Sequence, residues 1–490
     1  MPPKMTFLDV LYNLFGIIVL AFYVIAVISV VTRIVVKRRP IGVSLAWLAI
    51  IFALPVAGVM TYLIIGEIRL GRKRVMNAQR IYYPYRQWIH ALTQRLSVTP
   101  SLPTIKAAPL VQLVQQRLGM PLLTNNDVVL IDHPDLFFES LLQSIQQAKS
   151  SCFMEFYIWE QTGRVEQIVK ELILATERGV DCRLLLDDIG SKVFLQSEIC
   201  RQLQQKGIQI VAALPAKAWR AFFQRQDLRL HRKLILIDDH IAFTGSMNMV
   251  DPQTASQKDM FGDWIDLVAK IQGPSVPVLW SLFAHDWEME TGVCLLDLYH
   301  HQAEAFPGGF PVQMIPSGPF IGGNTIQQLL LQALYQAEKS IILTTPYFVP
   351  DDPLVSALTT AASRGVSVKI IIPEKNNSWF VSYASDAFLE ELIQAGVEIY
   401  RFKTGLLHTK SILIDNSLAL IGTVNLDRRS LWLNFEVTLL IDSPMFSLQL
   451  QKVISSYLLS AHQLDYERWK NRHWWKKVLE NIIYLFSPLL

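Results

Sequence analysis

The chain has 490 residues, of which 51% are hydrophobic and 18% are charged, and its formal net charge is +3. This charge is too small for bulk electrostatic binding of nucleic acid, so we expect no nucleic-acid partner. The charged fraction lies below the roughly 25% of an average soluble protein, which favours a membrane protein. The length is sufficient for two or three domains.

Two long apolar segments near the N-terminus account for much of the low charge. Residues 10–32 and 40–66 contain no charged side chain, and each is long enough to cross a hydrocarbon core of about 30 Å as a helix. The sequence therefore predicts a two-helix transmembrane hairpin within residues 1–66. A cleaved signal peptide is disfavoured, because a second apolar segment follows the first almost at once. Basic residues flank the hairpin nearly evenly, so the membrane side of the remaining chain stays open.

After a linker and lead-in at residues 67–119, one succession of elements occurs twice. Amphipathic helical patterns alternate with short apolar strands over residues 120–300 and again over residues 310–465. In both parts a helix ends in Arg-Gly-Val, where Gly179 and Gly365 suit the left-handed position after a helix end. We predict an α/β fold of two repeated domains that lie face to face and form one active site.

The most distinctive part of the repeat is polar. Residues 231–248 read HRKLILIDDHIAFTGSMN and residues 408–425 read HTKSILIDNSLALIGTVN, so that His, Lys, Asp, Gly and Asn recur in one frame. A repeated core strand would need only its apolar residues to recur. These residues therefore predict one site made of two half-sites, with the members His231, Lys233, Asp238, His408, Lys410 and Asp415.

The residue types at these positions suit phosphodiester chemistry. Side chains two apart in a strand point to one face, so each His emerges with the Lys that follows it. One neutral imidazole can attack phosphorus while the second protonates the leaving alkoxide. Four groups can hold the nonbridging oxygens: Lys233, Lys410, Asn248 and Asn425. This chemistry requires neither a metal nor a cofactor, and we predict none.

Each half also carries a hydroxyl beside its glycine. Ser246 and Thr423 precede the two asparagines by two residues. We expect these hydroxyls to bind phosphate, with capping of the next turn as the alternative.

The two HxKx4D motifs resemble those of the phospholipase D superfamily, whose members build one active site from two such half-sites. The strings GSMNMVD, TTPYFVP, LLHTKS and GTVNLDRRSLWLNFE resemble the bacterial cardiolipin synthases of that superfamily, as does the hairpin ending in GEIRLGRKR. The resemblance covers essentially the full chain. It implies a multi-pass protein of the bacterial inner membrane that moves a phosphatidyl group between two phosphatidylglycerol molecules. The products would be cardiolipin and glycerol, formed through a phosphohistidine.

The resemblance also implies roles for individual residues. His231 would be the nucleophile and His408 the acid that then becomes the base, although the near symmetry allows the reverse. Asp238 and Asp415 would support the site rather than carry protons. Two later carboxylates, Asp266 and Glu436, would orient the imidazoles, with an ion pair to a neighbouring arginine as the alternative reading.

Other functions are compatible with the same pair of motifs. The same motifs can serve a hydrolytic phospholipase D or another phosphatidyltransferase such as a phosphatidylserine synthase, and the motifs alone do not exclude water as the acceptor. A nuclease is disfavoured because two membrane segments would serve it little. An inactive membrane scaffold is disfavoured because both His-Lys-Asp sets are complete. Oligomeric state and acyl-chain preference stay open.

The chain ends in a second, weaker membrane signal. Residues 466–490 include the string HWWKKVLENIIYLFSPLL, which combines tryptophans and lysines with an apolar stretch too short to span a bilayer. Such a segment predicts an amphipathic helix at the membrane interface. The alternative is a C-terminal helix docked on the core of the second domain.

Overall fold

The computed structural model describes residues 7–37, 41–67, 69, 71–95, 103–216, 225–255, 260, 262–299, 304–319 and 321–485. The chain divides into two compact units. The first unit comprises Met1–Val75 and Ala216–Asp227, and the second comprises Met76–Pro215 and Leu228–Leu490.

The first unit contains one long apolar helix and two short ones. Helix α1 (Phe7–Val36) includes Leu11–Val36, which is long and apolar enough to cross a membrane. The second predicted span is divided into α2 (Ile41–Ala53) and α3 (Pro55–Ile65), of 13 and 11 residues. A proline has no N–H to donate into a preceding turn, so the break falls before Pro55. The predicted hairpin of two spanning helices is therefore not confirmed, because a span needs about 20 residues.

A buried carboxylate connects two helices of the first unit. Glu67 is 3% exposed, and it accepts contacts from Arg33 at 3.0 Å, Lys37 at 3.1 Å and the Tyr62 hydroxyl at 3.0 Å. These contacts join the end of α1 to the end of α3. Residues 38–40 of the loop, which include Arg38 and Arg39, and residues 68 and 70 of the GEIRLGRKR string lie outside the described residues.

The second unit is built on one 15-stranded sheet whose two halves repeat the same order. From its centre outward the first half runs β1 (Leu122–Ile131), β8 (Val268–Gln272), β6 (Ile241–Gly245), β5 (Leu234–Ile237), β2 (Ser151–Phe156), β3 (Asp181–Asp187) and β4 (Gln209–Ala213). The second half runs β9 (Phe310–Ser317), β18 (Glu436–Asp442), β16 (Leu418–Gly422), β15 (Ser411–Ile414), β10 (Ser340–Thr344), β12 (Ser367–Pro373) and β13 (Glu398–Phe402), with β19 (Ala461–Gln463) at the edge. Antiparallel pairing of β1 with β9 joins the halves. The predicted α/β fold of two repeated domains is confirmed, but the halves are joined edge to edge through β1 and β9 and do not lie face to face as predicted.

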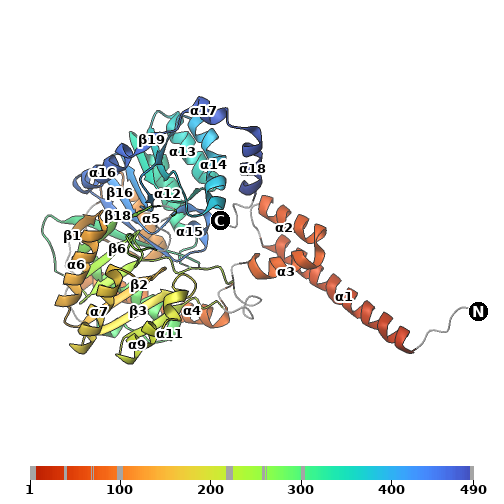
Figure 1. The fold of residues 1–490 in the computed structure, drawn as a ribbon, viewed down its shortest axis with the longest axis horizontal. Helices are drawn as coiled ribbons and strands as arrows, with labels where there is room; N and C mark the ends of the chain where they lie inside the picture. Colours follow the sequence, from red (N-terminus) through yellow and green to blue (C-terminus); the bar gives the residue numbers. More distant parts are fainter. Residues whose placement is uncertain are drawn as a thin grey trace, which may run out of the picture. The chain divides into compact units, whose positions relative to one another are not determined.

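Each half buries its own hydrophobic core between the sheet and its helices. Figure 1 shows the two sets of helices on their respective halves. The first half carries α6 (Pro134–Gln147), α7 (Arg164–Glu177), α9 (Glu198–Gln205) and α11 (Val276–Thr291). The second half carries α12 (Thr325–Gln336), α13 (Asp352–Ser363), α14 (Trp379–Gln394) and α16 (Pro444–Leu459).

The predicted lead-in and C-terminal segment are also helical. The lead-in contains α4 (Arg72–Arg95) and α5 (Ala108–Leu118). The C-terminal segment contains α17 (Tyr466–Lys470) and α18 (Trp474–Tyr484). Residues 486–490, which include the terminal SPLL, lie outside the described part of the chain.

Candidate active site

A backbone connection between the halves positions the first histidine. The His231 N–H donates to the carbonyl of Phe435 at 2.9 Å, and the Phe435 N–H donates to the carbonyl of Arg229 at 2.9 Å. Together these bonds form a parallel bridge between Leu230 and Phe435. His231 is thus attached to the backbone just before Glu436, a residue of the opposite half.

The second histidine has the equivalent connection. Strand β14 (Leu406–Leu407) pairs in parallel with β7 (Trp264–Ile265), and the His408 N–H donates to the carbonyl of Ile265 at 2.9 Å. His408 is therefore attached to the backbone just before Asp266 of the first half.

The side chains of these residues meet crosswise. His231 Nδ1 lies 2.9 and 2.8 Å from the two carboxylate oxygens of Glu436, and His408 Nδ1 lies 2.6 Å from Asp266 Oδ1. Each half thus supplies the carboxylate that contacts the histidine of the other half. Among the described residues these imidazoles, and no arginine side chain, form the ion-pair contacts of both carboxylates.

Burial and nearby lysines keep both imidazoles neutral at neutral pH. Burial lowers the pKa of His408 to about 4, and Lys410 acts in the same direction. Burial also lowers the pKa of His231 well below its usual range, with Lys233 and Lys410 adding to the effect. Because each Nδ1 faces a carboxylate, the proton belongs on Nδ1 and the lone pair on Nε2. Nε2 is therefore the atom available to a phosphorus.

The two carboxylates differ in their electrostatics. Burial raises the pKa of Glu436 to about 7, although Lys233 opposes the rise. Burial also tends to raise the pKa of Asp266, but the contact with His408 and the charge of Lys410 hold it below its usual value. Asp266 is therefore ionised at neutral pH, whereas Glu436 titrates there.

The two lysines lie against the histidine backbone. Lys233 Nζ donates to the carbonyl of His231 at 2.6 Å, and Lys410 Nζ donates to the carbonyl of His408 at 2.7 Å. Lys233 Nζ also lies 5.6 Å from the centre of the Tyr157 ring. Burial lowers the pKa of Lys233 to about 7 and that of Lys410 well below its usual range. An anionic ligand between them would restore both charges.

The two asparagines stand in different environments. The Asn248 side-chain oxygen accepts from the Ile158 N–H at 3.2 Å. The Asn425 side-chain oxygen is buried and has no hydrogen-bond partner among the described residues. A buried amide oxygen without a partner is costly, and a ligand hydroxyl at this place would satisfy it.

The aspartates of the two motifs lie at the opposite end of their strands from the histidines. Asp238 accepts from the N–H groups of Lys149, Ser150 and Ser151 at 2.7 to 2.9 Å. Asp415 accepts equivalent bonds from the N–H groups of residues 338–340 and a contact from Lys106 at 2.8 Å. Both aspartates have a φ of 50°, in the left-handed region that Asp tolerates. The structure thus gives them a role at the turns before β2 and β10.

The two hydroxyls beside the glycines have partners within the chain. The Ser246 hydroxyl donates to Asp266 Oδ1 at 2.6 Å and accepts from the Leu267 N–H at 2.9 Å. The Thr423 hydroxyl accepts from the Val437 N–H at 2.9 Å. Each hydroxyl is thus bonded beside one of the two carboxylates, and phosphate binding by Ser246 and Thr423 stays a prediction.

Sequence reasoning missed several residues around the histidines. Tyr157 packs edge-on against His231, with ring centres 5.1 Å apart, and Trp264 lies 4.9 Å from His408. The Asn434 amide donates to Glu436 at 3.3 Å. Tyr157 directly follows β2 and Trp264 lies two residues before Asp266, and these positions are the signal that could have revealed them.

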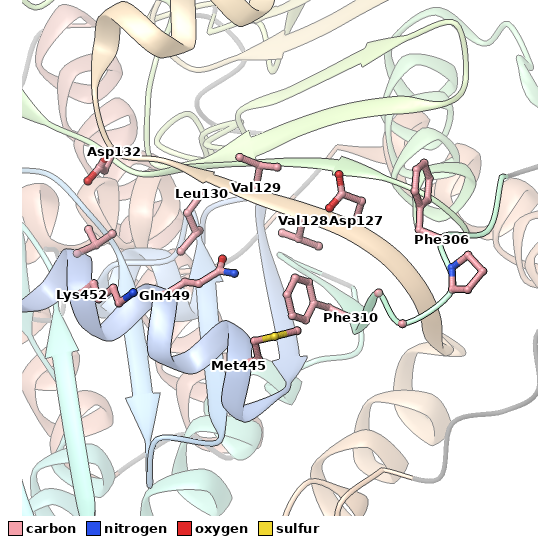
Figure 2. A pocket seen from close by; sticks show the side chains of 14 residues that line it. Asp127, Val128, Val129, Leu130, Asp132, Phe306, Phe310, Met445, Gln449 and Lys452 are labelled. Carbon is pink, nitrogen blue, oxygen red and sulfur yellow. The ribbon is translucent and has the colours of Figure 1, made fainter.

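An open groove of about 600 Å³ lies apart from these residues (Figure 2). Its walls come from β1, the segment before β9, and α16, with Val129, Phe306, Phe310, Met445 and Lys452 among the lining side chains. None of its described lining residues is a histidine. Among the described residues there is also no group of three or more His, Cys, Asp or Glu that could hold a metal ion.

Comparison with known families decides the classification. The family model described as "Cardiolipin synthase, PLD-like domain" matches residues 141–262 and 330–458, and "Phospholipase_D-nuclease N-terminal" matches residues 21–67. The chain belongs to the cardiolipin synthase family of the phospholipase D superfamily. The family predicted from the two HxKx4D motifs is thereby confirmed.

Individual relatives of this family cover nearly the whole chain. Cardiolipin synthase A of Pectobacterium carotovorum subsp. carotovorum (strain PC1) is 44% identical over 96% of this chain and 97% of its own length. Cardiolipin synthase A of Yersinia pseudotuberculosis serotype O:1b (strain IP 31758) is 43% identical over the same shares. Among solved structures, phosphatidylserine synthase of Haemophilus influenzae Rd KW20 matches with a TM-score of 0.58 at 16% identity, covering 78% of this chain and all of that one. This last likeness concerns the fold alone.

Proposed function

We propose that the protein is a cardiolipin synthase that transfers a phosphatidyl group from one phosphatidylglycerol to the terminal hydroxyl of another, releasing glycerol. The observation that carries the proposal is the crosswise pairing of two neutral imidazoles with two carboxylates. Membership of the cardiolipin synthase family supports the same reaction.

In the first step His231 Nε2 attacks the phosphorus of the donor lipid. A P–N bond forms, the P–O bond to glycerol breaks, and His408 in its protonated form gives its Nε2 proton to the departing alkoxide. The donor phosphate offsets the positive lysines that lower the pKa of His408, so substrate binding favours the protonated acid. The phosphohistidine carries a positive imidazole ring, which the Glu436 carboxylate stabilises.

In the second step the neutral His408 takes the proton of the acceptor hydroxyl. The new P–O bond forms, the P–N bond breaks, and His231 is regenerated with its proton on Nδ1. We assign Lys233, Lys410, Asn248 and Asn425 to the nonbridging oxygens of the phosphate, where charge increases in both transition states. His231 and His408 are 7% and 3% exposed, and this limited access favours an alcohol delivered by a lipid over bulk water.

The decisive experiment is product analysis by mass spectrometry. The purified protein receives phosphatidylglycerol as its only lipid, with a chelator present, beside the variants His231→Ala and His408→Ala. We expect cardiolipin and glycerol from the wild type, and from the variants no cardiolipin and no more than one equivalent of glycerol. Phosphatidic acid without cardiolipin would instead identify a hydrolytic phospholipase D. Trapping of the phosphohistidine in His408→Ala but not in His231→Ala would assign the nucleophile.

We also propose that the first unit anchors the protein in the bacterial inner membrane, with α1 as one span. Residues 41–65 contain no charged side chain and expose large apolar side chains such as Phe52, Leu54 and Val56. A proline break is tolerated within membrane helices where neighbouring helices satisfy the freed carbonyls. We therefore propose a second crossing by α2 and α3 together.

We propose further that α18 lies at the membrane surface. One side of α18 packs on the domain through Ile483 and the 3.0 Å Lys477–Glu390 ion pair with α14. Its other side exposes an apolar stripe of Trp474, Trp475, Val478, Ile482 and Leu485. Tryptophans beside basic residues are typical of helices at the headgroup level of anionic membranes.

A fluorescent label tests the position of α18. An environment-sensitive fluorophore on Ile482→Cys, in a Cys294→Ser background, should shift to shorter wavelength and be quenched by spin-labelled lipids after reconstitution. The same label on Ser455→Cys, an exposed position of α16, provides the control and should not respond. Equal quenching at both positions, or at neither, would contradict the proposal.

A further inference from the structure

The residue between His and Lys in the first motif connects the two halves through a buried charge. Arg232 is fully buried. Its Nε donates to the carbonyl of Glu436 at 3.0 Å and its Nη2 to the carbonyl of Ser317 at 3.4 Å, both in the second half. Its Nη1 donates to the Asp286 carboxylate on α11 of the first half. The guanidinium therefore holds the backbone of the residue whose side chain contacts His231.

The second motif has a neutral counterpart. Thr409 occupies the equivalent position, and its hydroxyl donates to the carbonyl of Ile265 at 3.1 Å and lies 3.1 Å from the Tyr457 hydroxyl on α16. Ile265 directly precedes Asp266. Both residues thus hold the strand that leads to a carboxylate of the opposite half, but only Arg232 brings a positive charge.

Several titratable groups surround the positive charge of Arg232. Lys233, Lys410 and Asp427 act electrostatically on Glu436, along with Arg232 itself. On the α11 side, Arg232 faces Asp286, with His285 Nδ1 3.0 Å from the same carboxylate. On the β2 side it faces Glu155, which is fully buried, has no hydrogen-bond partner among the described residues and has its pKa raised by burial to about 7.

We propose that Arg232 is a positioning residue: it aligns the Glu436 carboxylate on His231 through the Glu436 carbonyl and adds its positive charge to those of Lys233 and Lys410, which favour the ionised carboxylate. The inference rests on the proposed function, in which His231 becomes a positively charged phosphohistidine. A protonated Glu436 would lose the attraction to that ring. Arg232 touches no reacting atom, so its effect passes through Glu436.

The pH dependence of the reaction distinguishes this role from simple packing. Glu436 has a raised pKa of about 7, so its carboxylate form, and the activity, are present at higher pH and lost as the pH falls. In Arg232→Gln the loss of positive charge raises that pKa further. We expect about a fivefold lower rate of lipid turnover at pH 7, a midpoint of the rising limb shifted up by about one unit, and partial recovery near pH 9.

Three further variants serve as matched controls. Arg232→Lys keeps the charge and should lower the maximal rate without moving the midpoint. Thr409→Val removes the neutral counterpart and should behave in the same way. Glu155→Gln removes the other buried carboxylate whose pKa is about 7, and the shift caused by Arg232→Gln must persist in that background. Lys233 also has a pKa of about 7, but it loses its charge as the pH rises and so contributes a falling limb, not the rising one.

Specific outcomes would overturn the inference. A rate lowered equally at all pH values in Arg232→Gln, with thermal unfolding close to that of the wild type, would reduce Arg232 to a packing residue. If Arg232→Gln no longer moves the midpoint of the pH–rate profile in the Glu155→Gln background, the rising limb of that profile belongs to Glu155. If Arg232→Gln does not fold, the double variant Arg232→Gln with Asp286→Asn removes both charges of the buried pair. The same upward shift in the midpoint of its pH–rate profile is then the expected result. Absence of cardiolipin from the wild type would instead refute the proposed function, since the midpoint can be measured on any product.

Discussion

At the scale of single residues, the repeated motifs combine two unrelated tasks. The His, Lys and Asn of each motif could be predicted from the sequence because polar residues that recur in one frame are hard to explain by packing. The position of Asp238 was predictable as well, since seven residues at about 3.3 Å each place it some 20 Å along the strand from His231. The pairing of Glu436 with His231 was not, because the choice between two carboxylates depends on how the halves meet.

Two substitutions separate these tasks. Glu436→Gln should lower kcat by about 10²-fold or more, because an amide neither stabilises the charged ring nor fixes its tautomer. Asp238→Asn should keep the kcat of the folded protein but lower the free energy of unfolding by about 1–3 kcal/mol, because charge-assisted bonds to three backbone N–H groups are weakened. Chemical denaturation beside the kinetic assay measures both. A large loss of kcat in folded Asp238→Asn would contradict the assignment.

At the scale of elements, hydrophobicity predicted membrane segments but not their continuity. Residues 40–66 meet the requirement of length and charge for a span, yet the helix is interrupted at Leu54–Pro55. Apolar composition indicates that a segment can lie in a membrane, but it does not show whether the helix is continuous. Here the missing N–H of one proline determines where the helix ends. The helix ends at Gly179 and Gly365 were easier to predict, because their φ values of 91° and 86° suit glycine.

Membrane topology tests the proposed second crossing. Two crossings place the N-terminus and the second unit on one side of the membrane, whereas a single crossing by α1 places them on opposite sides. Cys294 is exposed and the other three cysteines are buried, so an impermeant thiol reagent reports on the second unit. In sealed vesicles we expect an N-terminal tag and Cys294 to react from the same side. Reaction from opposite sides would leave α1 as the one span.

At the scale of the whole molecule, the sequence predicted two α/β repeats but not their fusion into one sheet. The repeats meet through β1 and β9, and each of the two histidine segments is bonded to the opposite half. Edge-to-edge pairing of this kind leaves no signature in hydrophobic periodicity, because both strands would look equally buried within separate domains.

Shared strands predict cooperative unfolding of the second unit. Separating the halves would expose the β1 and β9 edges and break both histidine connections, so neither half should remain folded after the other unfolds. In urea we expect tryptophan fluorescence and activity to change at one common midpoint. Two transitions, with activity lost in the first, would show that the halves unfold independently.

The crosswise exchange of carboxylates also has a consequence for descent. A single half carries a histidine and an acid that cannot reach each other, so a half-length ancestor could have worked only as a symmetric pair of identical chains. Once two copies are joined in one gene, their sequences no longer have to be identical. The two copies can then differ, as they do at Arg232 and Thr409, and two histidines that began as equals can take different roles.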